Sequence, residues 1–366
     1  MKSISRSTIT VQDVARNAGV SVGTVSRVLN GATNIAPENL KKVQVAIEEL
    51  GYQKNHSAGL LASRRIGSIA RTGNIGMVYT EVGASWRNHP LVAAYTLGVE
   101  QACKEKGYHS LTELSSDDNA VPRCVRERKI DGLLVRCTRT VPEFLKTEPL
   151  NIPVVFIGFN DPTIRFAQVA PDNQGAGWVM ADHLWQRGHR RIAFLCDDAL
   201  HPMFIARLHG YESYLRQRQA FAPERVIMKE HHRAGDRILP ESTPPDMTAL
   251  LTPLLAFPAD KRPTAILTAN DWMARGLYNA LVAHGLRVPD DMTVAGFDNM
   301  ELLCEAMVPP LTSFDPGFTA VARAAAMEVF DMIATPAEHR DPAVHLVRGR
   351  LAERGSVRPV NIHCPV

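Results

Sequence analysis

The sequence has 366 residues, of which 45% are hydrophobic and 22% charged, enough for two or three domains with substantial cores. A net charge of only +3 excludes a uniformly basic coat protein, and no apolar run approaches the ~20 residues of a membrane span. The charge is uneven, because residues 1–72 contain ten Lys or Arg and four Asp or Glu. A basic module therefore precedes a mildly acidic body, which indicates a polyanionic partner for the module alone.

The N-terminal region predicts three short helices with clear start and stop signals. Thr10 and Ser21 are N-cap residues, and Gly19 can end the first helix in a left-handed conformation. The expected helices are Val11–Ala18, Val22–Leu29 and Pro37–Leu50. Two short helices joined by a glycine turn can place the start of the second against base edges in a major groove.

Residues 52–73 are polar, basic and glycine-containing, and predict a linker with one short helical stretch, His56–Ala62. From Asn74 onward, short apolar runs alternate with helical segments, which is typical of parallel sheets covered on both faces. The length of this region favours two such α/β units, that is, two doubly wound lobes. The expected strands are Asn74–Thr80, Ile130–Arg136, Ile152–Gly158, Arg191–Asp197, Pro263–Ala269 and Met292–Asp298.

Polar or small residues stand where these strands end. The carboxyl ends of parallel strands in two facing lobes would present such residues to a ligand. The residues selected on this ground are Thr80, Arg136, Gly158, Asn270 and Asp298.

The residues also carry a family resemblance. Thr10–Ser21, Gly23–Gly31 and Leu50–Tyr52 together resemble the lactose/galactose-repressor (LacI/GalR) family of bacterial transcription regulators, whose effector domain is similar to periplasmic sugar-binding proteins. The resemblance implies a helix-turn-helix head over 8–53, a hinge helix over 54–65 and a linker over 66–73. A two-lobed effector and dimerisation domain over 74–355 would follow, crossed near 170, 315 and 345, with a tail over 356–366.

The resemblance implies DNA contacts in the head and the hinge. Val22 and Gly23 would face bases, and Arg27 would pair with a guanine. Thr24, Ser26 and Asn30 would contact phosphates and set the register. In the hinge, Leu61 would insert between base steps of the minor groove, above Ser57 and Ala58. Lys54 and Gly59 depart from the family pattern there, and glycine lowers helix stability by ~1 kcal/mol relative to alanine.

Effector contacts are also implied. The Asp298 position commonly accepts sugar hydroxyls, and the Asn270–Asp271 corner supplies further polar contacts. Trp178 stands where sugar-binding members often have an arginine, so Arg136 is the expected cation, and Trp178 would stack on the ligand. Tyr79, Trp272 and Phe318 are further stacking candidates, for which ordinary packing is an equal alternative.

Enzyme signatures are incomplete. Gly19–Gly23 matches the G-x-S-x-G pattern but follows no strand, and the dinucleotide-like Gly175–Gly177 lacks its third small residue. Six cysteines show no C-x-x-C spacing. The sequence therefore predicts no catalytic residue, metal or cofactor. A solute-binding transport protein, and a sugar-active enzyme on an α/β fold, remain the alternative classes.

The sequence thus predicts a cytoplasmic, homodimeric regulator, with no membrane association. Its partners would be double-stranded DNA with a pseudo-palindromic operator and a small-molecule effector, by analogy a sugar or sugar derivative. The identity of the effector, the operator and target genes, the choice between induction and corepression, activation in place of repression, and assembly into tetramers stay open.

Overall fold

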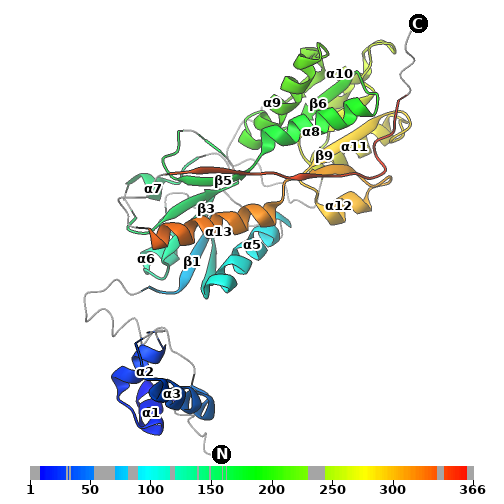
Figure 1. Ribbon diagram of the computed structural model, residues 1–366. Coiled ribbons are helices and arrows are strands. Elements are labelled where there is room, and N and C mark those ends of the chain that lie inside the picture. Colours follow the sequence, from blue (N-terminus) through cyan, green and yellow to red (C-terminus); the bar gives the residue numbers. More distant parts are fainter. Residues whose placement is uncertain are drawn as a thin grey trace, which may run out of the picture. The chain divides into compact units, whose positions relative to one another are not determined.

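The computed structural model divides the chain into two compact units, Met1–Thr72 and Gly73–Val366 (Figure 1). It describes residues 9–29, 32, 34–52, 71–80, 90–115, 120–137, 140–147, 150–158, 160–161, 163–229, 244–335 and 342–360. Asn30 and the whole predicted hinge helix over 54–65, with Ser57, Ala58 and Leu61, lie outside these residues.

The first unit contains the three helices that the sequence predicts: α1 (Val11–Ala18), α2 (Val22–Leu29) and α3 (Pro37–Leu50). The Thr10 hydroxyl accepts a hydrogen bond from the Asp13 amide while the Asp13 carboxylate accepts one from the Thr10 amide, so the two residues form a capping box. Gly19 and Gly51 end their helices in the left-handed conformation. The three helices bury a small common core, formed by Val14, Ala15, Ala18, Val25, Val43, Ala46 and Tyr52.

The second unit contains two six-stranded sheets. The first has the order β11-β5-β4-β3-β1-β2, in which all pairs are parallel. Its strands are β1 (Asn74–Tyr79), β2 (His109–Leu114), β3 (Gly132–Arg136), β4 (Val154–Ile157), β5 (Ala167–Pro171) and β11 (Val344–Val347).

The second sheet has the order β12-β10-β9-β8-β6-β7 and is parallel except for the β10–β12 pair. Its strands are β6 (Ile192–Cys196), β7 (Val226–Met228), β8 (Ala265–Thr268), β9 (Thr293–Phe297), β10 (Thr312–Asp315) and β12 (Arg350–Ala352). In both sheets the second strand lies outside the first and the third lies on its other side. This doubly wound order confirms the predicted fold class and creates a topological switch point in each lobe.

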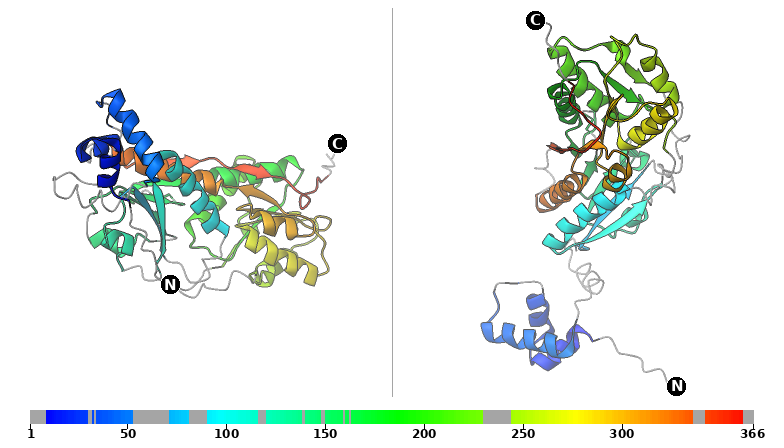
Figure 2. Two further views of the ribbon diagram at one scale, coloured as in Figure 1. Left: turned by 90° about the horizontal axis from the view of Figure 1, so that it is seen from below. Right: turned by 90° about the vertical axis from the view of Figure 1, so that its right-hand side faces the viewer.

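Helices cover both sheets. In the first lobe, α5 (Pro90–Lys106) and α13 (Phe318–Ala334) pack on one face of the sheet (Figure 2). The short helices α6 (Arg123–Arg126) and α7 (Glu143–Thr147) lie on the other. The second lobe has a closely packed pair, α8 (Asn173–Gln186) and α9 (Pro202–Gln217). It also contains α10 (Thr248–Leu255), α11 (Asp271–Ala283), α12 (Glu301–Ala306) and a 3₁₀ turn at Pro223–Arg225.

The chain passes between the lobes three times. It leaves the first lobe between β5 and α8, returns between β10 and α13, and leaves again between β11 and β12. The carboxyl ends of β1, β3, β4, β6, β8 and β9 are the positions where a doubly wound lobe presents ligand contacts. Within the described residues, no helix is long and apolar enough to cross a membrane.

Candidate effector site and DNA-binding head

Asp298 stands directly after β9 in a strained backbone conformation. Its φ of 100° lies in a region that non-glycine residues rarely adopt, and the next residue, Asn299, also has a positive φ. Hydrogen bonds from the Asp298 amide to the Phe314 carbonyl (2.9 Å) and from the Asn299 amide to the Ser313 hydroxyl (3.1 Å) hold this corner against β10. Such strain is stored at sites where a side chain must point in one direction.

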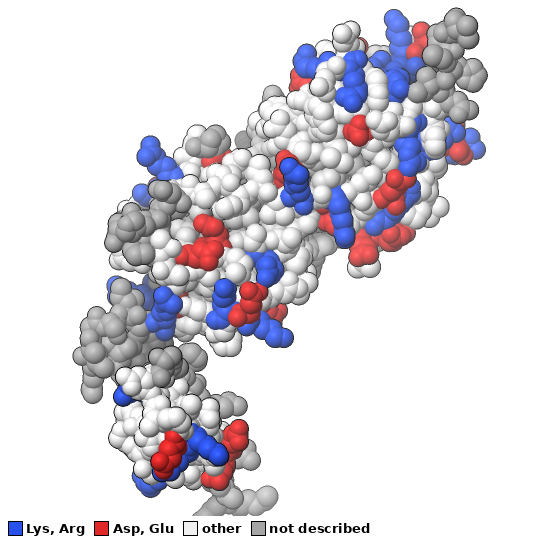
Figure 3. Space-filling view, viewed as in Figure 1, with Lys and Arg blue, Asp and Glu red and all other residues white. Residues whose placement is uncertain are grey.

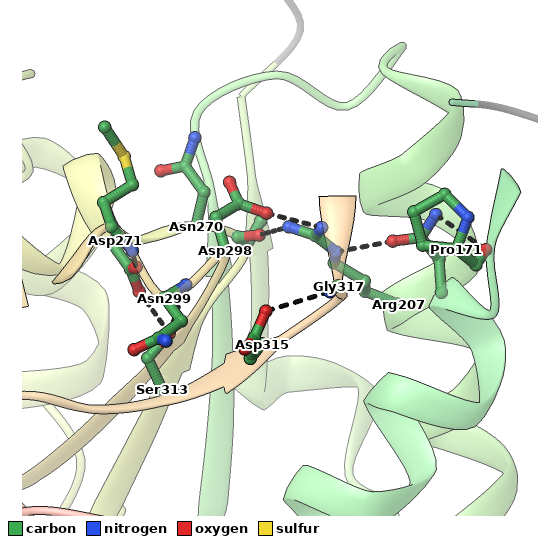
Figure 4. Close-up of polar contacts among 12 residues, drawn as sticks. Pro171, Arg207, Asn270, Asp271, Asp298, Asn299, Ser313, Asp315 and Gly317 are labelled. Atoms are coloured by element: carbon green, nitrogen blue, oxygen red, sulfur yellow. Dashed lines mark hydrogen bonds and ion pairs between the residues drawn. The ribbon is translucent and has the colours of Figure 1, made fainter. Parts of the chain in front are cut away.

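A buried arginine on α9 meets Asp298 (Figure 4). The Arg207 guanidinium is fully buried, and its Nη2 donates a 2.6 Å hydrogen bond to the Asp298 carboxylate. The same guanidinium donates to the Asn173 side chain (3.0 Å) and to the Ala269 carbonyl (2.7 Å). Arg207 therefore links the ends of β8 and β9 to the start of α8, and it lies over the ring of Phe297 at 4.9 Å.

The first lobe contributes Arg136, at the end of β3, and Tyr95, on α5, both buried. A β-carbon on Gly158, which follows β4, would lie 2.8 Å from Arg136 Nε and 3.0 Å from the Tyr95 hydroxyl oxygen. The guanidinium and the phenol therefore meet over this glycine. Burial raises the pKa of Tyr95, and the neighbouring Arg136 guanidinium partly opposes this shift.

Asn270 and Asp271 start α11 at the end of β8. The Asn270 side chain caps the helix by accepting from the Met273 amide at 2.8 Å. Asp271 is fully buried and accepts hydrogen bonds from the Ser313 hydroxyl, the Met300 amide and the Cys304 thiol, at 2.7, 2.8 and 3.2 Å. Burial, reinforced by the charge of Asp298, raises its pKa to about 7. Asp271 thus holds the loop that carries Asp298.

Two of the predicted stacking residues lie in the core of the first lobe. Tyr79 is fully buried, and its hydroxyl lies 3.5 Å from the Val92 carbonyl. Phe318 opens α13 and packs edge-on against Tyr95, with ring centroids 5.6 Å apart. Phe318 therefore orients a phenol of the site.

Trp178 lies elsewhere, contrary to the expectation. It is 37% exposed on α8 and packs edge-on against Tyr214, two turns beyond Arg207 on α9. The cation beside Asp298 is therefore Arg207, a residue that the sequence analysis did not select. A signal was present, because Arg207 falls among Met203, Phe204, Gly210 and Tyr211 on the buried face of a helix, where an arginine needs a partner.

In the head, α2 exposes one continuous face. Val22, Gly23, Ser26 and Arg27 are exposed, while Val25 packs into the core on the other side. Thr24 is half-buried, and its amide donates to the Ser21 hydroxyl at 3.1 Å. Arg27 Nη2 donates to the Asn34 carbonyl at 2.6 Å, so the structure holds this arginine against the segment before α3.

Figure 3 displays one face of the second unit. Basic and acidic side chains are interspersed over that face. The sequence assigns the excess of basic residues to residues 1–72, which contain the exposed face of α2.

Comparisons with known proteins give the family. Residues 10–55 match the profile of bacterial regulatory proteins of the lacI family, and residues 181–357 match that of a periplasmic binding protein-like domain. The chain is 31% identical to the HTH-type transcriptional repressor PurR of Pectobacterium carotovorum over 95% of this chain and 96% of the relative. It is 27% identical to PurR of Vibrio atlanticus over 96% of this chain and 99% of the relative.

Solved structures agree. A transcriptional regulator CelR–cellobiose complex has a TM-score of 0.63 at 27% identity and covers 95% of this chain and 100% of its own. The lac repressor dimer bound to operator and the anti-inducer ONPF shares the fold, with a TM-score of 0.70 at 23% identity over 96% and 100% of the two chains. The protein belongs to the LacI family: it is a DNA-binding transcriptional repressor with an effector-binding domain, and not an enzyme.

Proposed function

We propose that this protein represses transcription from a pseudo-palindromic operator, and that a small molecule bound between the lobes controls its affinity for DNA. The observation that carries the proposal is the Arg207–Asp298 pair, in which a fully buried arginine meets a carboxylate at the strand-end edge where a doubly wound lobe presents ligand contacts. The strained Asp298 backbone supports a binding role, since a purely structural ion pair does not require it.

The exposed face of α2 fits the DNA contacts expected from the sequence. Val22 and Gly23 would lie against bases and Arg27 would pair with a guanine, while Thr24, Ser26 and Asn30 would contact phosphates. The proposed minor-groove contacts of Ser57, Ala58 and Leu61 rest on the sequence alone. Leu61→Ala is expected to weaken operator binding and to reduce DNA bending while leaving effector affinity intact. If the variant bends the operator as much as the wild type does, Leu61 does not insert into the minor groove.

For the effector, a sugar or sugar derivative remains our proposal. Asp298 supplies a carboxylate oxygen for a hydroxyl, with the Asn270 side chain beside it at the neighbouring strand end (Figure 4). One structural relative is a transcriptional regulator in complex with cellobiose. Binding would shift the population of two lobe arrangements and thereby the DNA affinity of the head. Because a bacterial operator lies on DNA in the cytoplasm, we propose that the protein is cytoplasmic.

A homodimer follows from a two-fold operator, and the structure offers a surface for it. Leu302 of α12 is 91% exposed, Val308 just beyond it is 89% exposed, and Val282 of α11 is 72% exposed. A surface pocket of about 350 Å³ lies between the same two helices, lined by Pro244, Trp272, Arg275, Asn279, Leu303, Ala306 and Met307. We propose that a second copy of the chain covers this α11–α12 face.

Sedimentation tests the dimer surface. Leu302→Glu is expected to convert a dimer into a monomer, whereas Leu97→Glu, at a half-exposed position of α5, is the matched control and should leave the dimer intact. If the Leu302→Glu variant still sediments as a dimer, α12 is not part of the dimer interface.

A thermal-shift screen tests the effector site. Sugars, sugar acids, sugar phosphates and nucleosides are added to the wild type and to Asp298→Asn. A compound at ~100 times its Kd adds about 2.7 kcal/mol of stability. A shift that the variant loses supports the site between the lobes, and a shift that it keeps places the effector elsewhere. Operator titrations with the same compound then distinguish induction from corepression.

A further inference from the structure

The hydroxyl of Tyr95 is buried, and its hydrogen has no acceptor in the described part of the chain. The side chain is fully buried on the face of α5 that packs against α13. A buried hydroxyl that donates to nothing carries a desolvation cost, so its presence calls for an acceptor that binds from outside.

The neighbours of this phenol determine which atom faces outward. Arg136 Nε and the Tyr95 oxygen both lie within 3.0 Å of the position that a Gly158 β-carbon would take. A guanidinium has only donors, so the phenol oxygen beside it can act only as an acceptor toward Arg136. The hydroxyl hydrogen is then left to donate to a different group, and that group must be an acceptor.

The same phenol lies at the ligand-presenting edge of the first lobe. Arg136 and Gly158, which stand at the carboxyl ends of β3 and β4, lie against it, and Phe318 packs edge-on against its ring from α13. A molecule in contact with Asp298 would therefore have its far end near Tyr95. The two ends of the site differ in chemistry: a carboxylate in the second lobe accepts, and a phenol with a guanidinium in the first lobe donates.

We propose that Tyr95 is an effector-binding residue, which donates a hydrogen bond to a carboxylate or phosphate oxygen of the effector beside Arg136. The inference rests on the proposed function and deepens it, because it makes the effector an oxyanion: an organic acid or a phosphate ester. Its other end carries the hydroxyl or N–H donors that Asp298 accepts. Oxyanions are the groups that a guanidinium and a hydroxyl bind best together.

The first test needs no effector. Tyr95→Phe removes only the hydroxyl, which donates to no protein group, and the ligand-free variant is expected to melt closer to the wild-type temperature than the control variant. Tyr211→Phe is the matched control, because Tyr211 is equally buried and its hydroxyl donates to the Ile192 carbonyl at 2.8 Å. The control is expected to melt lower. If Tyr95→Phe melts as low as Tyr211→Phe, the Tyr95 hydroxyl donates to a structural acceptor and the proposal is overturned.

The second test uses glucose, gluconate and glucose 6-phosphate as probes in thermal shift and calorimetry on the full chain. The wild type is expected to bind one of the two acids in preference to glucose, and the two acids separate a carboxylate from a phosphate. Tyr95→Phe should weaken that binding by about 10- to 100-fold, the effect of losing a hydrogen bond to a charged group. Equal binding of glucose by both proteins would overturn the proposal.

The variants distinguish two kinds of failure. An acid whose binding is lost in Asp298→Asn but kept in Tyr95→Phe would reject the role of Tyr95 and leave the proposed function standing. An acid that both variants bind normally would reject the site between the lobes itself. If none of the three probes shifts the melting temperature, the comparison of Tyr95→Phe with Tyr211→Phe decides whether the role proposed for Tyr95 stands.

Discussion

Gly177 on α8 and Arg207 on α9 are in direct backbone contact: a β-carbon on Gly177 would lie 1.9 Å from the Arg207 carbonyl oxygen. Gly210 makes the reciprocal contact, since its β-carbon would lie 1.9 Å from the Gln174 carbonyl. The two glycines allow α8 and α9 to approach closely, as in the glycine contacts of tightly packed helix pairs. The position from which Arg207 reaches Asp298 is therefore set by helix packing.

Gly177→Ala is expected to destabilise the protein by at least about 3 kcal/mol, because the added methyl group cannot fit without separating the helices. Denaturant unfolding measures the change. Gly107→Ala is the control: Gly107 has a positive φ but open space around its β-carbon position, so only the backbone strain of roughly 1 kcal/mol is expected. Equal losses in both variants would show that α8 and α9 do not pack this closely.

Arg207→Met leaves the Asp298 carboxylate buried beside an apolar side chain. Removing one partner of a buried pair costs about 3–5 kcal/mol, and the unfolding free energy should fall by that amount. Arg216→Met is the matched control on the same helix, since Arg216 is 62% exposed in its pair with Glu212 and its loss should have little effect. A similar, small effect of both variants would mean that Arg207 is not essential to the fold around Asp298.

Asp271 makes the stability of the second unit depend on pH. Its folded pKa is raised to about 7 from 3.8, so between these values the folded protein holds a proton that the unfolded chain has lost. Stability from this group therefore falls as the pH rises from about 4 to about 7 and is level above that. The difference between the unfolding free energies of wild type and Asp271→Asn, followed over this range, isolates the effect, because the histidines are the same in both proteins. A flat difference would show that Asp271 ionises normally.

Arg27→Ala tests the DNA-binding head. A base contact predicts a loss of about 1–3 kcal/mol on the cognate site, with relaxed specificity at one position. Because Arg27 also donates to the Asn34 carbonyl, the melting temperature of the variant must be measured alongside. Equal weakening on cognate and random DNA, with a shallower salt dependence, would make Arg27 a phosphate contact.

The three helices of the head could be predicted with their exact bounds because their signals are local. Thr10, Gly19, Pro37 and Gly51 each act on the backbone within one turn. The central strands were found for a similar reason, since each is a continuous apolar run. The strand-end rule also selected Arg136, which is buried at the end of β3, and Asp298, which pairs with Arg207.

The remaining elements depend on tertiary contacts. Strands β10, β11 and β12 have only three or four residues and lack an apolar run, so their pairing partners define them. Arg207 lies in a helix whose local pattern does not reveal Asp298, 91 residues further along the chain. Trp178 was placed in the site by analogy of position, and the packing of α8 on α9 turned its ring toward Tyr214.

The three passages between the lobes have a consequence for protein engineering. Each lobe is assembled from separate stretches of the chain, and the last short stretch, Val344–Ala352, supplies an edge strand to both sheets. Neither lobe can therefore be expressed as one continuous fragment, and a stop codon after α13 would remove a strand from each. The head, in contrast, is a single uninterrupted segment. Hybrid regulators built from this chain should exchange the head with one cut and keep the sensing unit whole.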